Sequence, residues 1–581
     1  MLQKHWNTAL PALASTLFLL ACQSADSSKD EVFPREETLY VGGFDWATPG
    51  NFNPLASDPN WPIDGNIKLL YESLFAYDQL SGKLEPMLAA SFRQKDHAME
   101  VDLDTLARWN DGQPVTAQDV VFTFQVDSLF NTPRHGNWNF LANVKAPDSH
   151  TVILTLREDN FNPLVVLDML SEVGILPQHI WEPLLANAHN QWEKILQFKN
   201  DKAPVGSGPY RLQEYSPERI VLQRNDSYWG NAAHHGGKLP APKYIIHSLY
   251  NGNTDFNDAM AEGRLDLSSI FLPRIWTRTT DSIRAWSLKE PYHMPGSIPT
   301  LFIDLQHEPF SDKAFRHALA HGINYGQIKL LAVSNYTPAL KPGFILPFGA
   351  EAHFFNQADA DSFGYSFDLE KARKILTDAG YRWDSSGVLL NPVGSPVRSF
   401  TLECPQGWTD WEDVIKVAVE SLQMLGLDAQ GKFVDYPEWD RDVKLGKFDL
   451  IMKTQTADLF PSTPWKRFEQ VMSSRDSKPE GQEVFCNFGR YRNPRADELL
   501  AKIPGIRDSV QLAEGYRELN RIFMQDLPVL PLMYRPTQFY QFSTKHWTHF
   551  PTEEAPYASP QNLMVGAGVK ALWSIRPQGS H

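Results

Sequence analysis

Long apolar runs and basic clusters are both missing from most of this chain of 581 residues. After residue 21, no stretch approaches the roughly 20 apolar residues that a membrane-spanning helix needs. The net charge of −15 argues against nucleic acid or anionic lipid as a partner, because phosphate groups are bound by clustered Lys and Arg. The 42% apolar and 21% charged residues are typical of a soluble globular protein, and the length predicts more than one structural unit.

Catalytic motifs are missing as well. The sequence contains no nucleophile elbow, no phosphate-binding P-loop and no His-Glu-x-x-His zinc motif. His317 and His321 are four residues apart in sequence, but no third metal ligand accompanies them. Glycoside hydrolysis needs two facing carboxylates, and no motif singles out such a pair among the 69 acidic residues. We therefore predict that the protein is not an enzyme and has no catalytic residue, metal or cofactor.

An apolar segment is present at the N-terminus, shorter than a membrane-spanning helix. It follows Lys4 and ends in Leu19-Leu20-Ala21-Cys22, which resembles a bacterial lipobox. A cationic start, a short apolar core and a small residue before the cleavage point are typical of an export signal. We expect residues 1–21 to be removed, Cys22 to become the lipid anchor and residues 22–36 to form a flexible tether. The protein is then extracytoplasmic and attached to a bacterial membrane; the alternative is a soluble secreted protein with an incidental cysteine.

Cysteine is scarce in the rest of the chain, where only Cys404 and Cys486 occur. An oxidising compartment permits a disulfide between them. Their proximity does not follow from the sequence, so two buried free thiols are the alternative.

Periodic apolar patterns predict a succession of strands and helices. Short alternating runs predict strands, and the stripe Trp411, Val414, Ile415, Ala418, Leu422 and Leu425 predicts a helix. Thr116 and Asp119 resemble a capping box at the start of another helix. Strands are expected near 38–43, 98–103, 151–156, 210–214, 219–223, 244–249, 300–305, 399–403, 428–434 and 448–453, and helices near 63–74, 116–124, 256–262, 310–322, 369–379 and 411–425. The αβ succession after residue 300 favours a mixed sheet covered by helices.

Several short blocks follow one another in a characteristic order. They are Leu70-Tyr71-Glu72-Ser73-Leu74-Phe75, Leu84-Glu85-Pro86-Met87-Leu88-Ala89, the segment 108–122 (RWNDGQPVTAQDVVF), Val205-Gly206-Ser207-Gly208-Pro209-Tyr210 with Asn225-Asp226-Ser227-Tyr228-Trp229, and Tyr491-Arg492-Asn493-Pro494 with Asp497, Leu499 and Leu500. Together they resemble the oligopeptide-type (family 5) solute-binding proteins of ABC importers. The residues themselves are of the kind that shape turns and tight backbone approaches, so we expect them to be structural.

The resemblance implies an α/β, two-lobed periplasmic-binding-protein fold of class II with an extra subdomain. The first lobe would comprise 37–300, with the extra subdomain at about 80–195, and the second lobe 301–530. Residues 531–581 would return to the first lobe, so that two segments near 301–305 and 529–534 form the hinge. The partners would be a small ligand and the membrane subunits of an importer, and the protein is expected to be a monomer.

The segment Cys404–Trp411 (CPQGWTDW) is similar to a block of the subgroup that binds chito- and cello-oligosaccharides. Trp408 at a strand-to-helix turn can stack on a sugar ring, and Asp410 can accept hydrogen bonds from hydroxyl groups. The alternative is that Trp408 packs in the core and Asp410 caps the helix. Trp411 continues the apolar stripe, which predicts a core position.

Two more positions resemble ligand contacts of this subgroup, Asn253 and Trp547. Two others depart from its pattern. Residues 453–456 (KTQT) replace an expected Asn, and Phe485-Cys486-Asn487 replaces an Arg of the chitooligosaccharide binders. The sequence therefore predicts an oligosaccharide of the cello or chito type as ligand, with an oligopeptide as the alternative.

Overall fold

The computed structural model describes residues 33–580 apart from 45–47, 57–60, 64–66, 131, 133, 190, 251, 279–281, 456–459, 537 and 561–564. The expected signal sequence, the anchor Cys22 and most of the expected tether lie outside the described residues. Contacts between Cα atoms divide the chain into Met1–Pro34 and Arg35–His581, and the fold below is that of the second unit.

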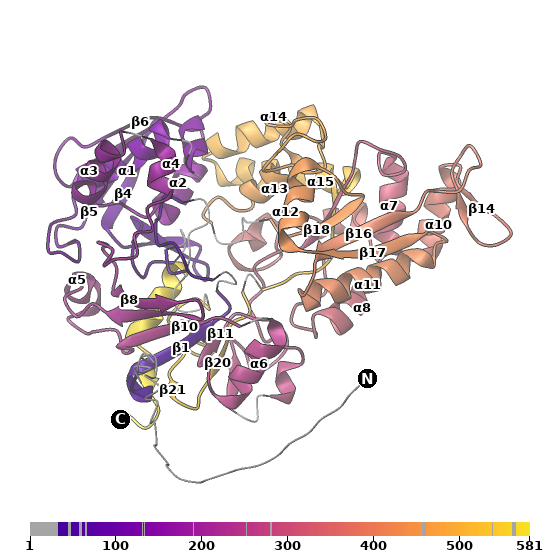
Figure 1. The fold of residues 1–581 in the computed structure, drawn as a ribbon. Helices are drawn as coiled ribbons and strands as arrows, with labels where there is room; N and C mark the ends of the chain where they lie inside the picture. The colour runs from indigo at the N-terminus through magenta and orange to yellow at the C-terminus, as the bar shows by residue number, and fades with distance from the viewer. Residues whose placement is uncertain are drawn as a thin grey trace, which may run out of the picture. The chain divides into compact units, whose positions relative to one another are not determined.

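A seven-stranded mixed sheet is built from six strands of the first half of the chain and one late strand (Figure 1). Its order is β12-β20-β11-β1-β10-β9-β8, and β1 runs parallel to β10 and β11. Leu39 and Val41 of β1 are fully buried, which fits an interior strand of a covered sheet. The elements are β1 (Thr38–Gly42), β8 (Tyr210–Ser216), β9 (Arg219–Arg224), β10 (Tyr244–Ser248), β11 (Leu267–Ser268), β12 (Ile283–Ala285) and β20 (Gln541–Ser543), with helices α5 (Gly230–His235) and α6 (Asn253–Glu262).

A four-stranded antiparallel sheet of order β4-β5-β7-β6 lies between β1 and β8 in the sequence. β5 and β7 alternate half-buried and buried residues, as expected for a sheet with one face toward the core. Its elements are β4 (Ala89–Lys95), β5 (Ala98–Leu103), β6 (Leu141–Lys145) and β7 (Thr151–Leu156), with helices α1 (Ala117–Leu129), α2 (Pro163–Glu172), α3 (Gln178–Asn187) and α4 (Trp192–Leu196). The hairpin of β2 (Phe75–Asp78) and β3 (Lys83–Pro86) precedes them.

A five-stranded mixed sheet of order β17-β16-β18-β13-β19 organises residues 300–531. β16 is parallel to β17 and β18, and β13 is antiparallel to β18 and β19. Its strands are β13 (Thr300–Ile303), β16 (Phe400–Pro405), β17 (Ala429–Val434), β18 (Leu450–Lys453) and β19 (Val529–Pro531). Its main helices are α7 (Lys313–Gly322), α10 (Leu369–Asp378), α11 (Thr409–Gln423), α12 (Tyr436–Leu445), α13 (Trp465–Met472), α14 (Pro494–Lys502) and α15 (Ser509–Asp526). The mixed sheet predicted after residue 300 is confirmed.

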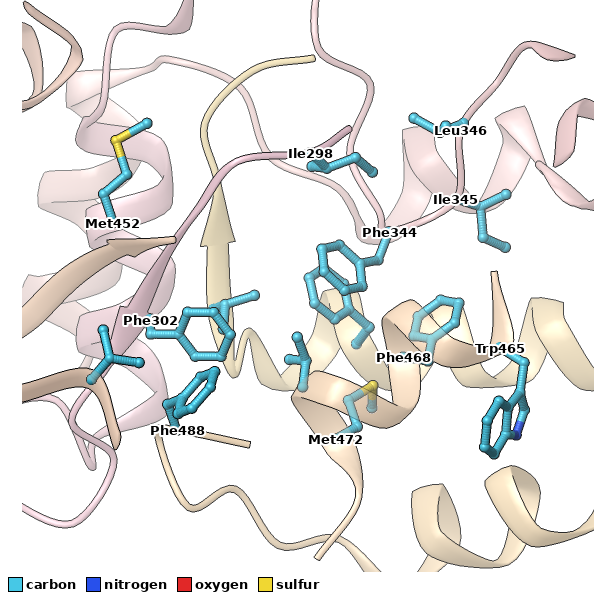
Figure 2. Packing of buried hydrophobic residues seen from close by; sticks show 14 of the residues in the cluster. Ile298, Phe302, Phe344, Ile345, Leu346, Met452, Trp465, Phe468, Met472 and Phe488 are labelled. Carbon is cyan, nitrogen blue, oxygen red and sulfur yellow. The ribbon is translucent and has the colours of Figure 1, made fainter. Parts of the chain in front are cut away.

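Phenylalanine rings fill the space beside this sheet (Figure 2). The rings of Phe302 on β13 and Phe488 pack edge to face with centroids 5.3 Å apart, and Phe344 stacks on Phe523 of α15 at 4.5 Å. Such pairs add to the stabilisation that burial of the ring area provides. The segments predicted as a hinge coincide with β13 and β19, which are hydrogen-bonded neighbours in the sheet; the hinge motion and the lobe boundaries stay predictions.

The predicted capping box is confirmed. The Thr116 amide donates to the Asp119 carboxylate at 2.8 Å, and α1 starts at the next residue, Ala117. Trp411 is also buried, as its helical stripe predicts.

The helix predicted at 63–74 is wrong over its described part, residues 67–74, which form no helix. The carbonyl groups of Leu69 and Leu70 accept hydrogen bonds from Tyr210 and Gly208, and the Glu72 carbonyl accepts one from Ile175. Backbone groups that bond to distant segments cannot form helical hydrogen bonds. The apolar side chains are buried here because the whole segment is covered.

The structure favours free thiols over the disulfide. Cys404 is buried in β16, Cys486 is partly buried in a loop, and both are free. Their surroundings differ, since the acidic groups near Cys404 belong to α11 and β16, whereas those near Cys486 include Glu469 of α13. Burial raises the pKa of both thiols, that of Cys486 to about 12. Among the described residues, no helix is both long and apolar enough to cross a membrane.

Candidate functional site

Three parallel strands of the five-stranded sheet end at one edge, and polar and aromatic residues follow each of them. Trp408 follows β16, Tyr436 and Trp439 lie in α12 after β17, and Lys453 ends β18. In open α/β sheets, ligands bind outside the carboxyl ends of such strands. We call this edge, with the residues that follow its strands, the carboxyl edge.

An aromatic cluster occupies the carboxyl edge. The Trp408 ring centroid lies 4.8 Å from that of Trp411, 6.0 Å from Tyr436 and 6.1 Å from Trp439. Trp411 and Trp439 are buried, and the Trp439 indole donates to the Met452 carbonyl at 3.1 Å. Trp408 is partly buried, whereas Tyr436 is 54% exposed. The cluster thus has a buried base and two rings that reach the surface.

Asp410 lies in the first turn of α11 and is buried in an ion pair. Its Oδ2 atom accepts from Arg535 Nε at 2.8 Å, and the Arg535 guanidinium lies 4.6 Å from the Phe539 ring centroid. Asp410 does not cap the helix, because the N-cap residue of α11 is Trp408 and no side-chain cap is formed there. Asp410 therefore holds Arg535 at this edge, a partner that sequence reasoning missed because it lies 125 residues away.

Asn253 connects the two large sheets at the same place. It starts α6, which follows β10 of the seven-stranded sheet. Its Nδ2 atom donates to Thr409 Oγ1 at 2.9 Å, in the first turn of α11. The structure therefore brings together three of the four predicted ligand contacts, Asn253, Trp408 and Asp410.

Trp547 lies elsewhere. It is fully buried in the core of the seven-stranded sheet, and its indole donates to the Thr38 carbonyl at 2.9 Å. Its ring is enclosed by protein in this structure, away from the carboxyl edge, and its contact with a ligand stays a prediction. Because an apolar Trp at the start of a short strand fits either role, the sequence alone could not distinguish them.

Lys453 is a residue of the carboxyl edge that sequence reasoning noted only as a departure from a pattern. Its Nζ atom lies 4.8 Å from the Trp439 ring centroid and 5.3 Å from that of Phe488. Beside it is a cavity of about 160 Å³ lined by Phe302, Asp440, Val443, Lys444, Lys453, Thr454, Gln455, Gln470, Phe485 and Phe488. Figure 2 shows the rings of Phe302 and Phe488 close to one another, and both line this cavity.

The characteristic sequence blocks have structural roles. Glu72 is fully buried, and its carboxylate accepts from Tyr228 Oη at 2.6 Å and from the Trp229 indole at 3.1 Å. Burial raises the pKa of Glu72 to about 7. A Cβ atom on Gly206 or Gly208 would lie 2.1 or 2.3 Å from a backbone oxygen, so both must be glycine. These blocks join the hairpin region to β8 and do not form the site.

The family model described as bacterial extracellular solute-binding proteins, family 5, matches residues 83–478. The chain belongs to this family. The oligopeptide-binding protein AppA of Bacillus subtilis is 25% identical over 564 residues, which is 91% of this chain and 94% of AppA. Family 5 proteins are extracytoplasmic binding proteins and not enzymes, and within the described residues no group of side chains is arranged to hold a metal ion.

Solved structures of family 5 proteins show the same fold. A mannohexaose-bound periplasmic oligopeptide-binding protein from Thermotoga maritima is 32% identical and covers 94% of this chain and 100% of its own, with a TM-score of 0.84. AppA of Bacillus subtilis in complex with a nonapeptide is 20% identical and covers 93% of this chain and 98% of its own, with a TM-score of 0.70. The two-lobed periplasmic-binding-protein fold is thereby established, and with it the role of solute-binding component of an ABC importer.

Proposed function

We propose that this family 5 protein binds an oligosaccharide of the cello or chito type and delivers it to the membrane subunits of an importer. The observation that supports this most is the pair of rings at the carboxyl edge, Trp408 and Tyr436. Their planes are inclined by only 31°, and Tyr436 is half exposed. Flat rings that reach the surface can stack on the apolar faces of successive sugar rings.

Polar groups beside these rings suit a ligand with many hydroxyl groups. Asn253 and Thr409 are already hydrogen-bonded to one another, and the Asp410–Arg535 pair lies in the same turn. Closure of the two lobes around a ligand would use contacts of this kind from both sheets. The similar Thermotoga maritima protein, crystallised with mannohexaose, adds support for a sugar ligand.

An oligopeptide is the alternative ligand. It is favoured by the similarity to AppA, which is described as oligopeptide-binding. A peptide would pair its backbone with exposed strand edges and would depend less on Trp408.

Calorimetry of the purified full chain distinguishes the two ligands. We expect heat of binding with cellobiose or chitobiose oligomers, and none with a mixture of di- to pentapeptides. Tight binding of a peptide with no response to either sugar series would overturn the proposal. Mannohexaose serves as a third sugar, because its binding alone would keep the class of ligand and change the sugar unit.

We also propose that Cys22 attaches the protein to the membrane through lipid. The lipobox-like sequence before it supports this. A Cys22→Ser variant should move from the membrane fraction to the soluble fraction. If it stays in the membrane fraction, the anchor is elsewhere.

A further inference from the structure

Lys453 carries a positive charge that the protein itself does not neutralise. Within the described part of the chain, its ammonium group makes no ion pair, and its neighbours at 4.8 and 5.3 Å are the rings of Trp439 and Phe488. Lys444, which lines the same cavity, is paired with Asp440 at 2.5 Å. Of these two lysines, only Lys453 is without an ion-pair partner among the described residues, so its charge is available to a ligand.

The surroundings make such a charge unfavourable. Burial lowers the pKa of Lys453; the nearby Asp440 charge opposes this in part, and the Lys444 charge lowers the pKa further. A cation–π contact contributes about 0.5–2 kcal/mol per ring, which offsets only part of the free energy lost when the ammonium group leaves water. A hydrophobic side chain such as Met would fit between two aromatic rings without that penalty.

A second polar group in the cavity also lacks a partner. Gln455 is buried, and its Nε2 atom donates to Thr300 Oγ1 at 2.9 Å. Its Oε1 atom is buried and accepts no hydrogen bond from any residue that the structure describes. Buried polar atoms are nearly always paired, so an unpaired acceptor beside an unpaired cation indicates that something else completes the site.

We propose that the cavity binds a carboxylate group of the ligand, with Lys453 as its counterion and Gln455 Oε1 accepting from a neighbouring hydroxyl or amide group. The cavity of about 160 Å³ can hold a carboxylate with the few atoms next to it, but not an oligomer. The rest of the ligand would extend toward Trp408, because the Trp439 ring neighbours both Lys453 and the Trp408 ring. This inference rests on the proposed function only for the position of the ligand at the carboxyl edge.

A carboxylate can come from two sources. One is a uronic acid residue in an oligosaccharide, which keeps a sugar as the ligand but adds an acidic residue to the proposed cello or chito type. The other is the free C-terminus of a peptide. The chemistry that Lys453 recognises is the same in both.

Calorimetry with matched pairs of ligands tests this inference. The sugar pair is cellobiose and cellobiouronic acid, and the peptide pair is trialanine and its C-terminal amide. A hydrogen-bonded charge pair predicts roughly 10- to 100-fold tighter binding of the acid than of its neutral counterpart. In Lys453→Met, we expect this preference to disappear while the affinity for the neutral counterpart stays unchanged.

Lys447→Met is the matched control, because Lys447 is exposed, lies just after α12 and does not line the cavity. It should keep the preference for the acid. The melting temperature of Lys453→Met should equal or exceed that of the unaltered protein, which shows that any loss of binding is not a loss of folding.

The outcomes separate this inference from the proposed function. Binding of the sugars with no preference for the acid in either the sugar pair or the peptide pair would overturn the inference and leave the proposed function intact. Lysine-dependent binding of trialanine alone would uphold the inference and overturn the sugar ligand. If neither acid binds better than its neutral counterpart, or if Lys453→Met weakens both members of a pair equally, Lys453 is a structural residue and the inference is wrong.

Discussion

The cluster around Glu72 and the carboxyl edge both combine a carboxylate with tryptophan. They differ in how many polar groups remain without a partner and in how many aromatic rings reach the surface. Around Glu72, both carboxylate oxygens accept hydrogen bonds from Tyr228 and Trp229, and all three side chains are buried. At the carboxyl edge, Asp410 is paired with Arg535, but Trp408 and Tyr436 reach the surface. Lys453 and Gln455 there retain charge and hydrogen-bonding capacity.

The difference separates structural clusters from ligand sites better than residue type does. A cluster that stabilises the fold has its polar atoms paired and its rings enclosed, since an unpaired buried group is costly. A binding site leaves some polar atoms unpaired and some rings exposed, so that another molecule can contact them. Substitutions that remove one aromatic ring or one carboxylate test this distinction. They should change stability in the structural clusters and ligand affinity at the carboxyl edge.

The largest effect is expected from Trp547→Ala. This fully buried indole packs in the core of the seven-stranded sheet, so its removal should lower the free energy of unfolding by about 3–5 kcal/mol. Urea unfolding followed by circular dichroism measures this. Ligand affinity of the folded fraction should not change; a selective loss of affinity with unaltered stability would mean that Trp547 does face the ligand.

Glu72→Gln should change how stability depends on pH. The pKa of Glu72 is raised in the folded state from 4.5 to about 7, so the folded state binds more protons between these values. The free energy of unfolding therefore falls as pH rises from 4.5 to 7, by on the order of 3 kcal/mol. Thermal unfolding from pH 4 to 8 should show a shallower fall for Glu72→Gln.

Glu554→Gln is the control for this measurement, because Glu554 is exposed. It should reproduce the pH dependence of the unaltered protein. If Glu72→Gln does so too, Glu72 is ionised in the folded state at pH 5, and the satisfied cluster is less apolar than its burial indicates.

The smallest effect is expected from Trp408→Ala, on affinity. Loss of a ring that stacks on the ligand should weaken binding by about 1–3 kcal/mol, or roughly 5- to 150-fold. The melting temperature should change much less than in Trp547→Ala, because Trp408 is only partly buried. Trp408→Phe keeps a ring and should recover part of the affinity. A large drop in melting temperature with affinity retained would assign Trp408 to the core.

Local signals in the sequence predicted much of the fold. The capping box of Thr116 and Asp119 and the apolar stripe of α11 depend on residues within a few turns, and both are present in the structure. The segment 67–74 was mispredicted as helix because its hydrogen bonds go to Gly208, Tyr210 and Ile175. Partners that far away leave no periodic trace in the sequence.

The candidate site was predictable only where its residues are close to one another in the sequence. Trp408 and Asp410 were found because a strand end and a helix start lie side by side in the sequence. Arg535 and Lys453 were not, since their roles depend on strands that come together only in the sheet. The burial of Trp547 likewise depends on β1, some 509 residues earlier.

The pairing of β1 also has a consequence for the order of folding. Its neighbours β10 and β11 come about two hundred residues later, and β20, the next strand of that sheet, belongs to the last tenth of the chain. The five-stranded sheet, in contrast, is complete within residues 300–531. Because contacts between distant residues form slowly, the region around β13 to β19 should mature first, while the seven-stranded sheet is completed only when β20 joins β11 and β12.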